Sequence, residues 1–593
     1  MSTVSAPQES STAFTPEQKE YLAGFLAGVA QLKLHSHAEA AKAETTPREK
    51  AIFGTPLSEV TRQERWKHEE HPLDGWDRLL SHAEAGRFPD EENTYRFRNF
   101  GLFYVAPAQN SFMLRCRIPA GELNAAQLLG LADIAQDFGN GKAAITTRSN
   151  MQVREIAPRN LVNVLTRLQS LGLTARGSGV DNIRNITASP TAGFDPQELI
   201  DTRPFAHALH HYILNHRDLY GLPRKFNVAF EGGGSVDTVA DTNDLGFMAV
   251  RIADPGVTGL SLKENASNAV EPGVYFRVEL AGIAGHKQLA TDAGILVKPT
   301  EVVASAVAMI RVFIENGDRT DRKKARLKYL IDKWGLEKFL AETQKKLAFP
   351  LMRLSLEKCL LRPTALRHGH IGIYRQKQKA KNYIGVVIPV GVMSSRQMRR
   401  IADISTNYGS GQVRLTPWQN LLIPDVPDGF VETVKRQLVR MGFHYEATNI
   451  AGGLVACTGN TGCKWAATDT KGQALALASY LNKQVQLDQP INIHLTGCPN
   501  SCAQHYIGDI GLQGVKVNAG GGSGEGYNIV FGGGCGTNGA IAKEVFKGIS
   551  FGEVPVLLER ALRKYLSRRQ AGESFADFTR RHELRQLQEM FSA

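Results

Sequence analysis

Apolar and polar positions follow two periods along the chain, and their order predicts a mixed α/β protein. Between residues 125 and 137, apolar side chains such as Leu128, Leu131 and Ala135 recur at the spacing of a helix with one apolar face. Strands are predicted over 112–118 and 143–155, and a second helix over 161–170. Strands that alternate with one-sided helices pack in layers around a shared core.

The same block of elements occurs a second time, 270 residues further on. Residues 118–153 and 388–423 share 11 identities in 36 positions without a gap. The register returns at an offset of 265, where Asn227, Gly232, Asp244 and Gly246 match Asn492, Gly497, Asp509 and Gly511. The second block predicts strands over 384–388 and 412–423, and helices over 396–407 and 430–441. The expected fold is therefore an internally duplicated α+β (mixed α/β) fold with pseudo-twofold symmetry and a large ligand between its halves.

Four of the seven cysteines form two close pairs in the second copy. Cys457 and Cys463 are separated by five residues, and Cys498 and Cys502 by three. Four thiolates in two pairs suit either a tetrahedral zinc ion or an iron–sulfur cluster, although structural zinc sites mostly use shorter spacings. The flanks are rich in Gly, Thr and Asn, which allow backbone N–H groups to point at sulfur.

This cysteine pattern, with Thr496-Gly-Cys498-Pro-Asn-Ser-Cys502, resembles the signature of the siroheme-dependent nitrite and sulfite reductases. The resemblance extends over roughly residues 90–590. It implies that Cys457, Cys463, Cys498 and Cys502 bind one [4Fe–4S] cluster. It also implies that Cys502 is the axial ligand of the siroheme iron, and that siroheme lies at the junction of the two copies.

Only the second copy carries the paired cysteines, and the first copy carries cations in its own motifs instead. Arg148 stands at the position of Trp418, and Arg115, Arg184 and Lys225 lie in further motifs of the first copy. Siroheme has eight carboxylates, so its pocket needs many Arg, Lys and N–H donors. The resemblance places Arg115, Arg184, Lys225 and Asn227 on the substrate face, and Arg148, Asn150 and Arg154 among the siroheme-binding residues.

The resemblance implies a six-electron reduction of nitrite to ammonia or of sulfite to sulfide. Nitrite reductases of this family carry Lys-x-Asn where sulfite reductases carry two lysines, and this chain has Lys225-Phe-Asn227. Because nitrite is a monoanion and sulfite a dianion near neutral pH, one fewer cation favours nitrite. Sulfite reduction is the main alternative. A ring-contraction enzyme of cobalamin biosynthesis with the same cysteine motif is a more distant one, and a non-catalytic electron carrier leaves the cation motifs unexplained.

Charge and composition restrict the partners. The net charge of +12 favours an acidic partner, but the basic residues are scattered and form no nucleic-acid-binding arm. No apolar run reaches the roughly 18 residues that span a bilayer, and the N-terminus lacks a secretory signal. We therefore expect a cytoplasmic monomer that receives electrons from reduced ferredoxin or flavodoxin near the cluster, with Lys464 and Lys471 as candidate docking residues.

The expected organisation has six segments. They are an N-terminal extension (1–95), a ferredoxin-like half-domain (96–170), a siroheme- and substrate-binding domain (171–317), a basic helical linker (318–375), a second half-domain (376–444) and a [4Fe–4S] and siroheme domain (445–593). Gly534–Gly539 fits the G-x-G-x-x-G pattern before a predicted helix over 540–546. No second half of a dinucleotide fold accompanies it, so a turn or a helix N-terminus facing siroheme is the better interpretation.

Overall fold

The computed structural model describes residues 50–253, 270–360, 365–448, 450–519 and 522–592. The chain divides into two units, Met1–Glu59 and Val60–Ala593. In the first unit, the described residues form a small antiparallel pair, β1 (Ala51–Ile52) with β2 (Thr55–Pro56). All the features discussed below belong to the second unit. Among the described residues, no helix has the length and apolar character needed to cross a membrane.

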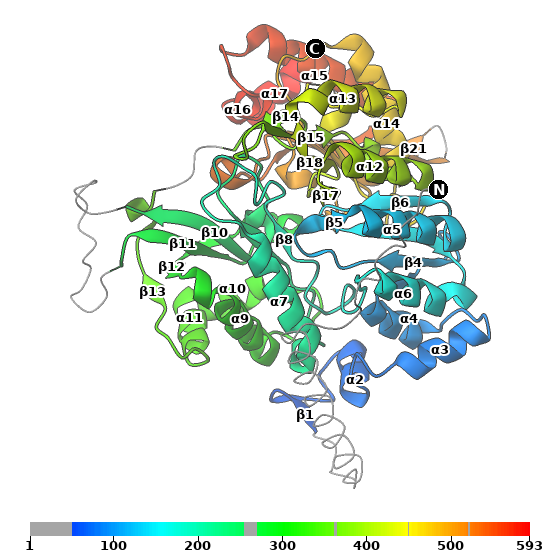
Figure 1. Cartoon of the computed structure of the whole chain (residues 1–593), viewed down its shortest axis with the longest axis vertical. Coiled ribbons are helices and arrows are strands. Elements are labelled where there is room, and N and C mark those ends of the chain that lie inside the picture. The colour runs from blue at the N-terminus through cyan, green and yellow to red at the C-terminus, as the bar shows by residue number, and fades with distance from the viewer. Residues whose placement is uncertain (1–49, 254–269, 361–364, 449, 520–521, 593) are drawn as a thin grey trace, which may run out of the picture. The chain divides into compact units, whose positions relative to one another are not determined.

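Two five-stranded sheets form the ferredoxin-like halves that the repeated block predicts (Figure 1). One sheet contains β3 (Leu102–Tyr104), β4 (Phe112–Arg115), β6 (Lys142–Ile145), β7 (Met151–Ile156) and β16 (Val392–Ser394). The other contains β5 (Glu122–Asn124), β14 (Gly372–Arg375), β15 (Lys381–Val386), β17 (Gln412–Leu415) and β18 (Leu421–Pro427). Their helices are α5 (Ala125–Phe138), α6 (Leu161–Ser170), α12 (Ser395–Tyr408) and α13 (Val431–Arg440).

The two halves exchange a strand. β5 comes from the first copy but pairs with β17 of the second, and β16 comes from the second copy but pairs with β6 of the first. The helices that follow these strands, α5 and α12, pack against each other, and their apolar faces share one buried core. The reciprocal exchange locks the copies together and confirms the pseudo-twofold arrangement.

The remaining two sheets repeat one topology. The first has β8 (Thr187–Ala188), β9 (Val228–Glu231), β10 (Leu245–Ile252), β11 (Gly273–Leu280), β12 (Thr291–Val297) and β13 (Met352–Arg353). The second has β19 (Leu454–Ala456), β20 (Ile493–Thr496), β21 (Ile510–Ala519), β22 (Gly522–Phe531) and β23 (Lys543–Ser550). In each sheet three parallel strands are followed by antiparallel ones.

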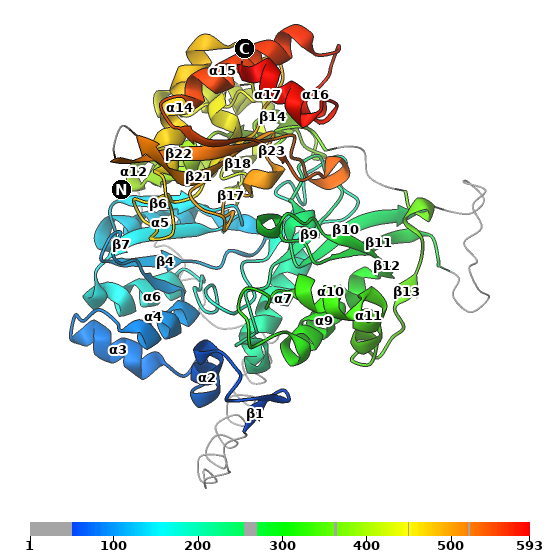
Figure 2. The same cartoon turned by 180° about the vertical axis from the view of Figure 1, so that it is seen from behind.

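Helices accompany these sheets in each copy. In the first copy they are α7 (Arg203–Asn215), α9 (Val302–Asn316), α10 (Leu327–Trp334) and α11 (Leu336–Gln344). In the second copy they are α14 (Thr470–Gln484), α15 (Val554–Arg568), α16 (Phe575–Arg580) and α17 (Leu584–Ser592), and α17 packs on β23 (Figure 2). The N-terminal part adds α2 (Arg62–Glu69), α3 (Trp76–Glu84) and α4 (Glu91–Phe97).

The single strands expected over 143–155 and 412–423 are wrong, because each segment is a hairpin. A turn separates β6 from β7 and closes with Thr146 N–H donating to the Asn150 carbonyl at 2.8 Å. The second copy repeats it, with Thr416 N–H donating to the Asn420 carbonyl at 2.9 Å. Ser149 and Gln419 have left-handed φ values of 47° and 59°. This conformation is costly for a residue with a side chain, so its recurrence at matched positions is strong support for duplication.

Two other expected elements differ. The helix expected over 540–546 is wrong, because 543–550 form β23, whose residues pair with β22 at the edge of its sheet. The basic helical linker expected over 318–375 is not one continuous helix: it contains α10 and α11, which are joined at Gly335, whose φ of 77° interrupts the helical path. Residues 318–326 precede them without helical structure and leave their cations on a loop.

Candidate functional site

The cysteine pairs lie at the same ends of two adjacent parallel strands. Cys457 follows β19 and Cys498 follows β20, so the sheet itself brings the two loops together. The N–H of Cys457 donates to the Leu495 carbonyl at 3.1 Å, and the N–H of Gly497 donates to Cys457 Sγ at 3.2 Å. A backbone N–H aimed at sulfur stabilises negative charge on a thiolate ligand.

The loop between Cys457 and Cys463 is fixed from both sides. Gly459 has a φ of 74°, and a Cβ there would lie 2.7 Å from the Thr470 nitrogen, so the turn requires glycine. From β7 of the first copy, Arg154 donates to the Gly462 carbonyl at 3.1 Å and to Thr458 Oγ1 at 2.9 Å. Arg154 therefore holds the cluster loop across the junction of the copies.

The four thiols lie within electrostatic reach of one another. Burial raises the pKa of Cys498, and Cys457 and Cys463 raise it further. Burial raises the pKa of Cys502 to about 11, against the opposing effect of Lys225, and the other three cysteines add to the rise. In the described part of the chain, however, no three His, Cys, Asp or Glu side chains converge as a single metal ion requires.

The two metal interpretations differ in the spacing that they require. Structural zinc sites mostly use pairs of cysteines that are closer in sequence than Cys457 and Cys463, and zinc binds four sulfurs at about 2.3 Å from one centre. The wider spacing, in loops whose backbone N–H groups point at sulfur, favours the [4Fe–4S] cluster.

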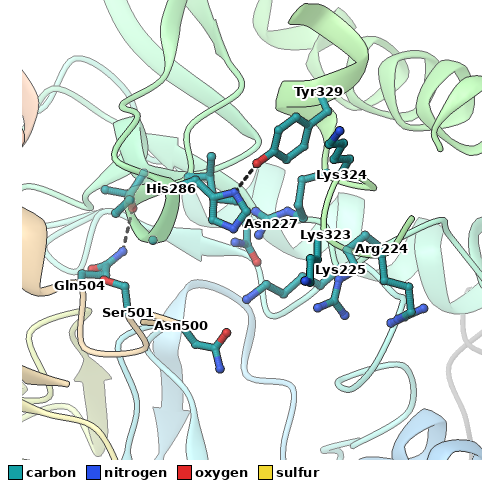
Figure 3. A pocket seen from close by; sticks show the side chains of 16 residues that line it. Arg224, Lys225, Asn227, His286, Lys323, Lys324, Tyr329, Asn500, Ser501 and Gln504 are labelled. Carbon is teal, nitrogen blue, oxygen red and sulfur yellow. Dashed lines mark hydrogen bonds between the residues drawn. The ribbon is translucent and has the colours of Figure 1, made fainter. Parts of the chain in front are cut away.

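A cavity of about 520 Å³ adjoins the second cysteine loop (Figure 3). Asn500 and Ser501, which lie between Cys498 and Cys502, border one side of it, together with Gln504. Lys225 and Asn227, just before β9, border the other side and point toward it in Figure 3. The cavity therefore joins the cysteine loop of the second copy to the cation motif of the first.

Six cations line this cavity, and among its described lining residues there is no Asp or Glu. They are Arg224, Lys225, Arg322, Lys323, Lys324 and Arg326. Arg322 and Arg326 are tied to buried carboxylates outside the lining, Asp181 at 2.7 Å and Asp244 at 2.7 Å. A cation-lined cavity without carboxylates fits a ligand that carries many carboxylates, as siroheme does.

Asp244 fixes the backbone of Asn227 beside the cavity. One of its carboxylate oxygens accepts the Asn227 N–H at 2.8 Å, while the same carboxylate binds Arg326. Burial and Arg326 lower the pKa of Lys225 to about 7, and Cys502 opposes this shift. An amine with this pKa holds or releases a proton near neutral pH.

Arg184 lies within electrostatic reach of both Lys225 and Arg115, but neither arginine is among the described residues that line the cavity. Arg115 projects from β4 over the Phe103 ring at 4.3 Å, and the side-chain amide oxygen of Gln152 can accept from its guanidinium at 3.2 and 3.3 Å. Burial lowers the pKa of Arg115 to about 10, with Cys502 acting in the opposite direction.

Arg184 donates to the Ser178 and Val180 carbonyls at 2.8 and 2.9 Å, and in the described structure its buried Nε has no partner. Burial and the neighbouring Arg115 lower the pKa of Arg184 well below its usual value. A buried donor without an acceptor favours binding of an anion.

Arg148 and Asn150 brace the turn between β6 and β7. Arg148 donates to the Asn185 carbonyl at 2.7 Å and to Asn243 Oδ1 at 2.7 Å, and Asn150 donates to the Cys116 carbonyl. Thr147, which precedes Arg148 in the same turn, donates a hydrogen bond from its hydroxyl to the Cys502 carbonyl at 3.1 Å. The turn therefore contacts the last cysteine directly, while the two side chains bond protein atoms.

Two features of the site were not predicted. The four cations of residues 322–326 line the cavity, whereas the sequence predicted only a basic helical linker there, without a role at the site. The density of positive charge in this segment was the only sequence signal that could have identified them. Lys471, expected at a docking surface, instead donates from Nζ to the Val390 carbonyl, and burial lowers its pKa to about 8. Lys464 is exposed.

Comparison with known proteins agrees with this geometry. Residues 179–351 and 451–590 match the family model of the nitrite and sulphite reductase 4Fe-4S domain, and 106–171 and 374–441 match the nitrite/sulfite reductase ferredoxin-like half domain. Ferredoxin–nitrite reductases of Synechococcus elongatus and Leptolyngbya laminosa are 32% and 34% identical, over 85% and 86% of this chain and 96% and 98% of theirs. The structure of Mycobacterium tuberculosis NirA matches with a TM-score of 0.79 and 28% identity, over 89% of this chain and 97% of that one. The chain therefore belongs to the nitrite and sulphite reductase family.

Proposed function

We propose that this protein is a ferredoxin-dependent nitrite reductase that converts nitrite to ammonia in a six-electron reduction. The observation that carries the proposal is the cavity in which Lys225 and Asn227 face the Cys498–Cys502 loop. A small oxyanion entering this cation-lined space meets one lysine and one neutral amide at the substrate face. That charge matches nitrite better than sulfite. The names of the relatives in cyanobacteria support the same substrate and donor.

The residues that would hold the cofactors are the four cysteines and the loops around them. Cys457, Cys463, Cys498 and Cys502 would bind the [4Fe–4S] cluster, with Cys502 also serving the siroheme iron. When bound, the two cofactors supply the iron at which the anion is reduced and the path by which electrons reach it. Arg154 holds the cluster loop, and the turn that contains Arg148 and Asn150 holds the Cys502 backbone through Thr147.

The chain's own residues then bind the anion and supply protons. Lys225, Arg115 and Arg184 form a positive group that favours entry of an anion and stabilises charge that develops on its oxygens. Asn227 orients the anion through its amide, and Asp244 fixes the Asn227 backbone. Lys225 is the best placed to give up a proton, because its ammonium lines the cavity.

The donor would be reduced ferredoxin, with flavodoxin as a substitute. The net charge of +12 attracts an acidic carrier over a distance of about 8 Å at physiological salt. We propose a transient one-to-one complex of a monomer with its carrier in the cytoplasm.

The test is a comparison of both anions on one preparation. Purified protein that shows the absorption bands of siroheme is assayed with nitrite and with sulfite, using a reduced viologen dye and then reduced ferredoxin. We expect a higher kcat/KM for nitrite with either donor. A higher kcat/KM for sulfite would instead identify a sulfite reductase, and absent siroheme bands would favour the corrinoid alternative.

A further inference from the structure

The loop that carries Cys463 also presents the most exposed large apolar side chain among the described residues. Trp465 is 67% exposed and lies two positions after Cys463. Lys464 stands between them, with its Nζ 5.2 Å from the centre of the Trp465 ring. A cation and an aromatic ring thus share one exposed spot beside a cluster ligand. Tryptophan dominates binding energy at the centre of many protein interfaces, and large exposed apolar groups mark such interfaces.

The backbone beneath Trp465 is fixed by both cysteine loops. The N–H of Ala466 donates to the Cys463 carbonyl at 3.1 Å, and the N–H of Ala467 donates to the Gly497 carbonyl at 2.6 Å. A Cβ on Gly497 would lie 2.6 Å from the Ala466 Cβ, so the loops pack in direct contact. A partner that buries Trp465 would therefore meet a preformed surface, which lowers the entropic cost of binding.

We propose that Lys464 and Trp465 form the docking point of the acidic electron carrier, with Trp465 as its apolar anchor and Lys464 facing its carboxylates. The inference rests on the proposed function and names the contact that the donor makes. Charge complementarity selects this occupant, because the chain carries +12 and one-electron carriers of the ferredoxin type are acidic. Docking here brings the carrier next to Cys463, the point at which electrons would enter the cluster.

The test compares Trp465→Ala and Lys464→Glu with matched changes elsewhere. Val439, 57% exposed on α13, gives the apolar control Val439→Ala, and Lys345, just after α11, gives the charge control Lys345→Glu. The holoenzymes are assayed with a reduced plant-type ferredoxin and with a viologen dye. We expect Trp465→Ala to raise the ferredoxin KM roughly tenfold, relative to dye-driven turnover of the same preparation. Lys464→Glu should raise the ferredoxin KM most at low salt, and the two control variants should keep a ferredoxin KM near that of wild type.

Binding of oxidised ferredoxin, followed by calorimetry at low ionic strength, tests the docking point without turnover. A ferredoxin affinity of Trp465→Ala equal to that of wild type would overturn the proposal, whichever anion the enzyme reduces. Failure of dye-driven nitrite reduction in wild type would instead refute the proposed function, while the binding measurement still decides the docking point. Sedimentation velocity tests whether a second copy of this chain, rather than the electron carrier, binds at Trp465. A wild-type dimer that Trp465→Ala converts to monomer would assign this spot to self-association and overturn the proposal.

Discussion

Glu122 offers a quantitative test of how the two copies are held together. It begins β5, the strand that the first copy contributes to the sheet of the second. Its carboxylate lies 3.0 Å from Arg414, 3.1 Å from Arg203 and 3.1 Å from the His207 ring. Burial alone raises the pKa of Glu122, but the His207 hydrogen bond and the charges of Arg414 and Arg203 outweigh it and lower the pKa to about 2.

The magnitude follows from that pKa. A carboxyl whose pKa falls from 4.5 to about 2 on folding stabilises the folded state by about 3 kcal/mol at neutral pH. This contribution is complete above pH 4.5 and is lost as the pH falls through about 2. Glu122→Gln removes the charge and leaves the buried Arg414 guanidinium without its carboxylate partner. We expect it to lower the free energy of unfolding by about 3 kcal/mol at pH 7.

The assay is urea unfolding of the holoenzyme, followed by circular dichroism at pH 7 and at pH 3. The difference in the free energy of unfolding between Glu122→Gln and wild type should be smaller at pH 3 than at pH 7, because at pH 3 the wild-type protein has already lost part of the stabilisation by the Glu122 carboxylate. Glu337→Gln is the control, since Glu337 pairs with Arg353 at the exposed surface. This substitution should lower the free energy of unfolding by less than about 1 kcal/mol. A Glu122→Gln protein as stable as the control at pH 7 would refute the reasoning.

The remaining predictions concern the cofactors, the substrate and the donor. Cys457→Ser should lower the iron and acid-labile sulfide content, whereas the buried core residue Cys116 should tolerate serine with iron near wild type; full content in Cys457→Ser would refute the ligand assignment. Asn227→Lys should raise the sulfite kcat/KM relative to that of nitrite, and an unchanged ratio would remove Asn227 as a selector. Arg154→Gln should make the cluster harder to reduce in an EPR redox titration, since a nearby positive charge is lost, and Arg154→Lys should restore much of the potential. The ferredoxin KM should climb with ionic strength while dye-driven turnover changes far less; a flat response would refute electrostatic docking.

The sequence was most informative where a feature is local or repeated. The helices over 125–137 and 161–170 lie within a residue of α5 and α6, because amphipathic spacing reports a local face. The turns at Ser149 and Gln419 were missed because neither carries glycine, the usual marker of a left-handed turn. The strand exchange was also beyond sequence reasoning. Pairing of β5 with β17 joins residues nearly 300 positions apart, and no local pattern encodes it.

The candidate site likewise contains residues that the sequence identified and residues whose surroundings only the structure shows. The cysteine pairs were evident because their spacing is a chemical signature that does not depend on tertiary context. Lys471 shows the limit: an isolated lysine looks solvated in sequence, yet its ammonium caps the Val390 carbonyl inside the protein. Trp465 shows the converse, since an aromatic residue in a Gly- and Ala-rich loop suggests packing, and only the structure reveals its exposure.

Duplication explains why one copy can bind metal while the other gathers charge. Asn492 and Asp509 repeat the backbone hydrogen bond of Asn227 and Asp244, at 2.7 and 2.8 Å, so both copies keep one frame. The second copy also has a cavity of about 320 Å³ at the matching place. Trp418 lines it, at the position that Arg148 holds in the first copy, and stacks on a histidine at 5.4 Å. The described lining of this second cavity also includes three carboxylates, Asp237, Asp509 and Asp577, beside Arg367 and Arg580, whereas no Asp or Glu is among the described residues that line the first cavity. Carboxylates repel an anionic ligand that cations attract. The copies therefore differ in side chains on a shared scaffold, and this difference makes the cavity beside the Cys498–Cys502 loop the better match for an anion.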